Sequence, residues 1–206
     1  MRIVAISDTH MRHEHVVVPD GDVLIHAGDF TRRGALEDVK AFDGWLATLP
    51  HRHKIVIAGN HDWCFQIAPE QARGCLTHAT YLEDSGAVIE GVRFWGSPWQ
   101  PWFLDWAFNL PRGPQLAEKW ALVPAETEVL VTHGPPRGFG DLTRNGEEVG
   151  CEDLLERIRA LQPRLHICGH IHEGSGVRTD GGVRYVNASV LDADYAVRHP
   201  ARVLDL

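Results

Sequence analysis

Five short apolar runs of this 206-residue chain each end in a cluster of polar residues. The first run, Ile3–Ile6, leads directly into Ser7-Asp8-Thr9-His10. Short β-branched runs that end at glycine or polar turn residues are typical of strands buried on both faces. The other four are Val23–Ala27 before Gly28-Asp29, Lys54–Ala58 before Gly59-Asn60-His61-Asp62, Val129–Val131 before Thr132-His133-Gly134, and Leu165–Cys168 before Gly169-His170-Ile171-His172.

Helical patterns separate these runs. Apolar residues recur at spacings of three and four between residues 36 and 49, and Pro50 ends that segment. Glu152–Leu161 repeats the pattern ahead of Pro163. Strands that alternate with helices predict an α/β fold. Further short strands are expected at Ala87–Ile89, Val92–Trp95, Val183–Val186 and near Val203, where they would form a mixed or second sheet.

Composition narrows the function classes. The chain has 28 acidic and 20 basic residues, and no basic stripe that would neutralise the phosphates of duplex nucleic acid. No apolar run approaches the roughly 20 residues of a membrane-spanning helix. We therefore expect neither duplex nucleic acid nor a membrane as partner. The four cysteines form no CxxC pair, and the first strand leaves no room for a signal peptide, which predicts reduced thiols and a cytoplasmic location.

The polar clusters offer oxygen and imidazole nitrogen but no thiol. In open α/β sheets, ligands bind beyond the carboxyl ends of the strands, where these clusters would meet. Such donors suit Mn²⁺, Fe or Zn²⁺. One Asp-x-His or Gly-Asp after a strand is an ordinary turn, but five ordered clusters favour a functional site. The candidate residues are Asp8, His10, Asp29, Asn60, His61, His133, His170 and His172.

In this order the clusters resemble the five motifs of the calcineurin-like metallophosphoesterases. The resemblance implies a two-sheet β-sandwich flanked by helices, with two divalent metal ions. The chain length predicts one domain, or one domain with a sizeable insertion, and we assign residues 1–206 to a single domain. The resemblance also implies which residues act. One ion would be held by Asp8, His10, Asp29 and His172. The other would be held by Asn60, His133 and His170, with Asp29 bridging the two ions. The catalytic residue would be His61, with Asp62 as its orienting partner.

Additional motifs narrow the resemblance within the family. Thr132–Pro136, Gly169–Gly174, Val186–Ser189 and Ser97–Pro101 resemble a branch that includes class III cyclic-nucleotide phosphodiesterases and a related vertebrate brain protein. In that vertebrate relative the Gly-His-x-His motif is altered and activity is weak, whereas both histidines are present here. The resemblance implies an active phosphodiesterase for small anionic nucleotides, including cyclic ones, with manganese as the expected metal and iron or zinc as alternatives.

The chemistry of a phosphodiester explains a two-metal site. Its anionic oxygens repel hydroxide, and two ions ~3.5–4 Å apart lower the pKa of a bridging water and hold the oxygens of the displacement. His61 and Asn60 are adjacent on an extended segment and point apart, so His61 would protonate the leaving oxygen or contact the phosphoryl group.

Three other functions remain as alternatives. Two are enzymes with the same centre, a phosphomonoesterase and a dinucleotide-polyphosphate hydrolase. The third is a metal-free interaction scaffold.

Candidate substrate contacts come from less specific features. The segment 96–114 is rich in aromatic residues and prolines, and its tryptophans either cap the core or stack on a flat substrate such as a base. The second alternative assigns Trp99 and Trp102 to the substrate. His13 lies either on a solvated loop or against the substrate. Asn187 follows a late strand and either reaches the site or bonds to the backbone.

Overall fold

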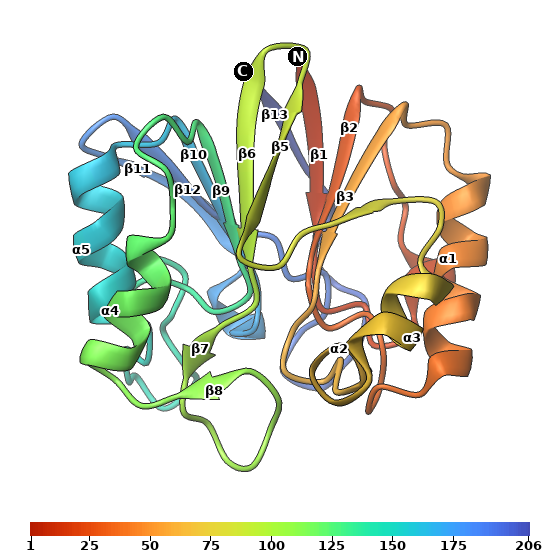
Figure 1. Ribbon diagram of the computed structural model, residues 1–206, viewed down its shortest axis with the longest axis horizontal. Helices are drawn as coiled ribbons and strands as arrows, with labels where there is room; N and C mark the ends of the chain where they lie inside the picture. The colour runs from red at the N-terminus through yellow and green to blue at the C-terminus, as the bar shows by residue number, and fades with distance from the viewer.

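The computed structural model describes residues 1–206 and contains two β-sheets packed face to face, with helices on both outer sides (Figure 1). The first sheet has the order β13-β1-β2-β3-β4. Its strands β1 to β4 are parallel, and β13 pairs with β1 in the antiparallel direction. Their bounds are β1 Arg2–Ile6, β2 Val23–Ala27, β3 His53–Ile57, β4 Thr80–Tyr81 and β13 Arg202–Asp205.

The second sheet has the order β11-β12-β10-β9-β6-β5. Its four inner strands, β12, β10, β9 and β6, are parallel, and the two outer strands pair in the antiparallel direction. A separate ribbon pairs β7 (Gln100–Pro101) with β8 (Asn109–Leu110). The bounds in the sheet are β5 Ser85–Ile89, β6 Val92–Ser97, β9 Val129–Thr132, β10 Leu165–Cys168, β11 Gly176–Asp180 and β12 Val183–Asn187.

Helices cover the outer face of each sheet (Figure 1). The first sheet carries α1 (Leu36–Thr48), α2 (Cys64–Ile67) and α3 (Pro69–Cys75), and the second carries α4 (Pro114–Ala121) and α5 (Glu152–Leu161). Short 3-10 turns occupy His13–His15 and His172–Gly174. None of the helices has the length and apolar character needed to cross a membrane.

Burial on both faces explains why the strand sequences are continuously apolar. In β1, Ile3 and Ala5 belong to the core between the sheets, whereas Val4 and Ile6 belong to the core beneath α1. A third core lies under α4 and α5 and contains Trp120. Alternate residues of a strand point to opposite faces, so a strand between two cores must be apolar at every position.

The two-sheet α/β fold flanked by helices is confirmed, and the expected strands and two long helices are present. Sequence patterns did not predict α2, α3, α4, β4 or β11. These elements are short, and a segment of two to eight residues has too few apolar positions for its period to stand out. The segment 96–114 contains the β7–β8 ribbon and the loop that joins its two strands.

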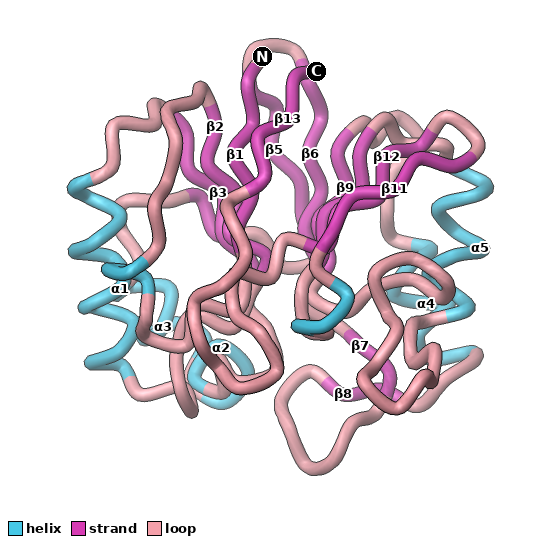
Figure 2. Tube along the Cα trace, turned by 180° about the vertical axis from the view of Figure 1, so that it is seen from behind, coloured by secondary structure: helices cyan, strands magenta, loops and turns pink.

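The chain order places the polar clusters together. Strands β1, β2, β3, β9 and β10 run in the same sense, and their carboxyl ends meet at the edge of the sandwich where the β7–β8 ribbon lies (Figure 1). The view from behind shows the loops gathered at the same edge (Figure 2). Residues that follow five different strands therefore converge on one site.

Candidate active site

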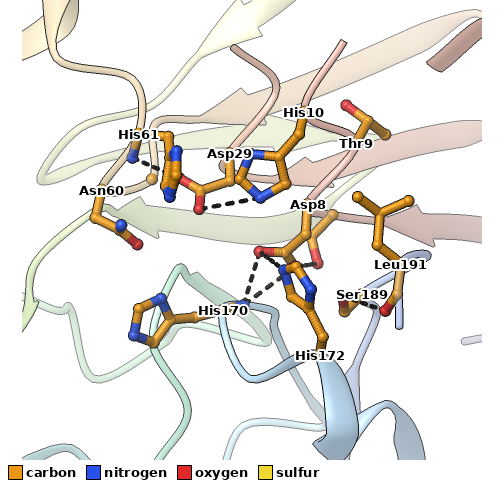
Figure 3. Close-up of polar contacts among 12 residues, drawn as sticks. Asp8, Thr9, His10, Asp29, Asn60, His61, His170, His172, Ser189 and Leu191 are labelled. Carbon is orange, nitrogen blue, oxygen red and sulfur yellow. Dashed lines mark hydrogen bonds and ion pairs between the residues drawn. The ribbon is translucent and has the colours of Figure 1, made fainter. Parts of the chain in front are cut away.

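Two buried carboxylates lie at the middle of the site. Asp8 follows β1 and is fully buried, and Asp29 follows β2 with 2% exposure. Both have left-handed backbone conformations, with φ of 56° and 60°. Such conformations cost of order 1–3 kcal/mol in a residue with a side chain and concentrate at functional sites. The sharp turns after β1 and β2 direct both carboxylates to the junction between the sheets (Figure 3).

Histidines from other strand ends face these carboxylates. The Nε2 atom of His172 lies 3.7 Å from an oxygen of Asp8. The Nε2 atoms of His10 and His133 lie 3.7 and 3.4 Å from the same oxygen of Asp29. Asp29 therefore lies between two groups of histidines, one with His10 and His61 and the other with His133 and His170.

Backbone carbonyl groups orient three of these rings. The Nδ1 atoms of His10, His133 and His172 lie 3.3, 2.9 and 3.0 Å from the carbonyl oxygens of Thr31, Ala27 and Asp192. A neutral ring that donates from Nδ1 to a carbonyl presents the lone pair of Nε2 on its other side. Metal-binding histidines are held in this way, with Nε2 as the ligand atom.

The resulting donor set fits divalent cations. The possible ligand atoms of Asp8, His10 and His172 lie within 4.8 Å of one another, as do those of Asp29, His133 and His170. The Nε2 atom of His10 is buried and has no hydrogen-bond partner. We call Asp8, Asp29, Asn60 and the four histidines His10, His133, His170 and His172 the carboxylate–histidine centre.

The surroundings of His133 give a second indication of a cation. Its Nδ1 atom faces the carbonyl of Ala27, while Nε2 lies 2.9 Å from Oδ1 of Asn60 and 3.4 Å from Asp29. When Nδ1 donates to Ala27, Nε2 presents its lone pair to the carboxylate of Asp29, and a cation between the two atoms would satisfy both. Nitrogen and oxygen donors of this kind suit Mn, Fe or Zn.

Electrostatics keep the carboxylates of the centre ionised. Burial alone would raise the pKa of Asp8, but the hydrogen bond and charge of His172 lower it below its ordinary value. Burial opposes the charge on His172, yet Asp8 raises the pKa of His172 to about 9. Burial would also raise the pKa of Asp29, but the charge and hydrogen bond of His133 lower it below its ordinary value. Burial opposes the charge on His133, yet Asp29 raises the pKa of His133 to about 9. Two buried negative charges therefore stand where cations would bind.

Two glycines allow the loops to approach the carboxylates. A Cβ atom on Gly59 would collide with the carboxylate of Asp29, and one on Gly169 would collide with Ser7 and Asp8. Both glycines precede a residue of the centre, Asn60 and His170 respectively. Any side chain at these positions would push the loops away from the carboxylates.

His61 stands at the mouth of the centre. Its Nδ1 atom lies 2.8 Å from the carbonyl oxygen of Arg32, and its backbone N–H donates to Asp29 at 2.8 Å. The ring of Trp106 stacks on it at a centroid distance of 4.0 Å and an interplanar angle of 21°. These contacts fix the ring, and with Nδ1 directed to the carbonyl, Nε2 is the atom left for a ligand.

The expectation that Asp62 orients His61 is wrong. The carboxylate of Asp62 is buried and accepts hydrogen bonds from the backbone N–H groups of Asp29, Gly59 and Thr31 at 2.8 to 2.9 Å. Its fourth donor is the Thr31 hydroxyl. Asp62 therefore fixes the loops that carry Asp29 and Asn60, and the Arg32 carbonyl takes the place expected for it at His61.

Two candidate substrate contacts point away from the site. His13 is 3% exposed, and its ring packs on Phe42 and Trp45. Trp99 donates from Nε1 to Asp84 at 2.9 Å and packs edge-on against Phe108 in the core. Assigning these residues to the substrate is therefore wrong. His13 is buried, so it does not lie on a solvated loop either, and Trp99 is half-buried and packs against the core, as the core-capping alternative expects.

Asn187 also acts within the protein. Its amide nitrogen donates to the carbonyl oxygens of Gly140 and Ile171, both at 2.8 Å, and its oxygen accepts from the backbone of Ser189. It is 2% exposed and contacts backbone, not the main pocket. Asn187 thus holds the segment between His170 and His172 in place, which is the backbone alternative of the sequence analysis.

Trp102 does line the site. The main pocket has a volume of about 430 Å³ and opens onto His10, Asp29, Asn60, His61, His170 and His172. Trp102, which is 60% exposed, and Phe103 form part of its wall. Phe103 packs edge-on against His170 at 5.6 Å. The tryptophans of one segment thus divide between the core and the pocket.

Sequence reasoning missed three aromatic residues of the site. Trp106 stacks on His61, Phe103 contacts His170, and Tyr195 packs against the rings of His10 and His172 at 5.1 and 5.0 Å. None of these residues follows one of the five strands directly. For Phe103 and Trp106 the one signal was the aromatic composition of segment 96–114, which does not say which ring faces the site, and Tyr195 lies outside that segment.

Comparison with known proteins agrees with this geometry. The calcineurin-like phosphoesterase family model matches residues 1–174. Human metallophosphoesterase domain-containing protein 1 is 47% identical over an alignment that covers all of this chain and 71% of the human protein. This match confirms the resemblance to the branch that contains vertebrate metallophosphoesterase-domain proteins.

Solved structures share the fold at low sequence identity. One superposes with a TM-score of 0.71 over 98% of both chains at 18% identity. The protein TT1561 of Thermus thermophilus superposes with a TM-score of 0.59 over 90% of this chain and 88% of that chain at 15% identity. Together with the family model and the human relative, they lead to one conclusion: the chain belongs to the calcineurin-like phosphoesterase family.

Proposed function

We propose that this protein is a metal-dependent phosphodiesterase that hydrolyses small anionic phosphodiesters, including cyclic nucleotides. The observation that carries the proposal is the carboxylate–histidine centre, in which Asp29 lies between two groups of histidines at the floor of the main pocket. The family membership supports a phosphoesterase. The extension to diesters rests on the pocket and on His61 beside the centre.

Two divalent ions are the proposed cofactors, with manganese first and iron or zinc as alternatives. Asp8, His10 and His172 would hold one ion, and Asn60, His133 and His170 the other, with Asp29 shared. When bound, the ions would lower the pKa of a water between them and neutralise the charge of the phosphoryl oxygens. Asn60 is a neutral donor, which limits the negative charge around the pair.

The residues of the chain position and protonate the substrate. The carbonyl of Arg32 and the ring of Trp106 hold the ring of His61 in one orientation. Nε2 therefore faces the substrate with little loss of side-chain entropy on binding. A proton on Nε2 can pass to the oxygen that leaves the phosphorus. The carbonyl groups behind His10, His133 and His172 keep each of these rings turned toward the carboxylates.

The main pocket supports a small substrate. A volume of about 430 Å³ falls within the range of pockets for small molecules, ~300–1,000 Å³. Trp102 and Phe103 offer flat apolar surface for a base. Arg112 and Arg144 also line this pocket, and each forms an ion pair with a glutamate. We propose a small nucleotide, not a duplex nucleic acid or a membrane, as the partner. The four free cysteines support a reducing compartment such as the cytoplasm.

A substrate panel tests the proposal. Purified protein with added Mn²⁺ is assayed on bis(p-nitrophenyl) phosphate, p-nitrophenyl phosphate, cAMP, cGMP and 2′,3′-cyclic nucleotides, and bound metal is measured by elemental analysis. We expect two metal ions per chain and faster turnover of diesters than of the monoester. Faster turnover of the monoester would indicate a phosphomonoesterase. Absence of both metal and turnover would indicate a scaffold.

A further inference from the structure

A second pocket adjoins His61 next to the main pocket. It has a volume of about 690 Å³ and shares His10, His61 and Tyr195 with the main pocket. The ring of Trp106 forms part of its wall. We call it the arginine pocket, because its remaining wall contains Arg12, Arg32 and Arg33, with Met11 and His15.

The three arginines of this pocket are not neutralised. Neither an ion pair nor a side-chain hydrogen bond engages the guanidinium groups of Arg12, Arg32 or Arg33. Arg33 lies 5.6 Å from the ring centroid of Trp106, and no carboxylate side chain lines the pocket. Nearby, Asp38 accepts only the backbone N–H of Arg32, at 3.3 Å.

The main pocket shows the opposite arrangement. Its Arg112 pairs with Glu152 at 2.5 Å, and its Arg144 pairs with Glu173 at 3.5 Å. An acidic chain with a formal net charge of −8 thus leaves three positive charges together at one side of the catalytic histidine. Guanidinium groups bind phosphate with paired hydrogen bonds, and a pocket that concentrates them attracts anions.

The position of the arginine pocket defines which part of a substrate would enter it. This step rests on the proposed function. If His61 protonates the leaving oxygen, the leaving group lies against His61, whose ring forms a wall of both pockets. We propose that the arginine pocket binds a second phosphate, carried by the leaving group, so that the preferred substrates are diesters whose leaving alcohol is itself phosphorylated.

The reaction leaves the second phosphate unchanged. Water adds to the diester phosphorus, the bond from phosphorus to the leaving oxygen breaks, and that oxygen takes the proton of His61. The products are a phosphomonoester and an alcohol that still carries its own phosphate. The guanidinium groups of Arg12, Arg32 and Arg33 act in binding alone, because the charge that they contact does not change during the reaction.

Three dinucleotides provide the test: TpT, pTpT with a terminal 5′-phosphate, and TpTp with a terminal 3′-phosphate. In each phosphorylated compound, one direction of cleavage releases a leaving group that carries phosphate, and the products identify that direction. We expect at least one of them to have a KM about tenfold below that of TpT, with similar kcat, since charge-assisted contacts to phosphate are the added interaction.

Variants separate the pocket from the rest of the site. Arg12→Ala and Arg33→Ala should each remove most of the preference for the phosphorylated dinucleotide, and Arg33→Lys should retain part of it. Arg159→Ala is the matched control, because this arginine also has no ion-pair partner but lies in α5, outside both pockets. Equal KM for all three dinucleotides in the wild type would overturn the inference.

A binding measurement covers the case of slow turnover. Thymidine 3′,5′-bisphosphate and thymidine 5′-phosphate are titrated into the Mn²⁺-loaded protein in a calorimeter, and the bisphosphate should bind about tenfold more tightly, by an amount that Arg33→Ala removes. Equal affinities would contradict the arginine pocket. Turnover of bis(p-nitrophenyl) phosphate tests the proposed function separately, because that substrate has no second phosphate.

Discussion

The carboxylate–histidine centre differs from the residues that surround its opening. Six of the seven members of the centre are buried, all seven lie within a few residues of a strand end, and backbone carbonyl groups hold three of its histidines. We define the rim as His61, Trp102, Phe103, Trp106 and Tyr195, which lie on loops and line the two pockets. Trp102 is 60% exposed, whereas Asp8 is fully buried.

This difference separates two tasks. The centre depends on the fold itself, because its residues leave the ends of strands that also build the core. The rim depends on loops, which can change in length and sequence without altering the sheets. In the proposed function, the sandwich therefore activates the phosphoester and the rim selects the substrate.

The largest effect is expected at Asp29, which lies between both groups of histidines. Asp29→Asn replaces a shared carboxylate by a neutral amide, so metal content should fall below two ions per chain and kcat should fall by at least about 10³-fold. Elemental analysis and turnover of bis(p-nitrophenyl) phosphate measure both. A variant with two ions and near-normal turnover would contradict the role of the centre.

Asp43→Asn is a control for Asp29→Asn. Asp43 accepts hydrogen bonds from the backbone and side chains of Thr77 and His78 at 2.8 Å, outside the two pockets. Its loss should lower the free energy of unfolding by about 1–3 kcal/mol, because those contacts are to a charged group. Metal content should remain the same as in the wild type.

A smaller effect is expected at His61, which joins the centre to the rim. His61→Ala should retain both metals, since His61 is the proposed proton donor and not a ligand, while kcat falls by about 10²–10⁴-fold. The metal measurement is decisive here because His61 also lies within 4.8 Å of possible ligand atoms of His10 and Asp29. Loss of one ion would assign His61 to the metal instead.

The sequence predicts the centre well because strand ends are predictable. A buried strand is recognisable by its apolar run, and a polar residue directly after it must lie at the edge of the sheet. Asp8 and Asp29 follow this rule, as do His133 and His170. The partners behind the centre were not predictable, since the Arg32 carbonyl and the Asp62 contacts depend on how loops cross.

The rim shows why the remaining residues escape prediction. Trp99, Trp102 and Trp106 are close in sequence, yet one enters the core, one faces the main pocket and one stacks on His61. The β7–β8 ribbon pairs Gln100 with Asn109, and this pairing sets the path of the chain that carries the three tryptophans. A two-residue pairing of this kind leaves no periodic pattern in the sequence.

Replacing Trp106 should lower kcat less than replacing His61, because Trp106 is a positioning residue that acts through His61. Trp106→Ala removes the stacking partner of His61 and should lower kcat about tenfold with little change in KM, because the ring becomes free to rotate. Trp106→Phe keeps a flat ring and should restore most of kcat. Equal losses in both variants, or a change in KM alone, would show that Trp106 does not position His61.

The smallest effect on catalysis is expected at Trp102, for which Trp99 is the matched comparison. If a base stacks on Trp102, Trp102→Ala should raise KM for a nucleotide by about tenfold, given ~1–3 kcal/mol per stacked base. Turnover of bis(p-nitrophenyl) phosphate should change less, and the melting temperature should hold because Trp102 is exposed. Trp99→Ala breaks a contact with Asp84 and packing on Phe108, so it should lower the melting temperature and affect both substrates alike. The same response from both tryptophans would remove the distinction between core and rim within this segment.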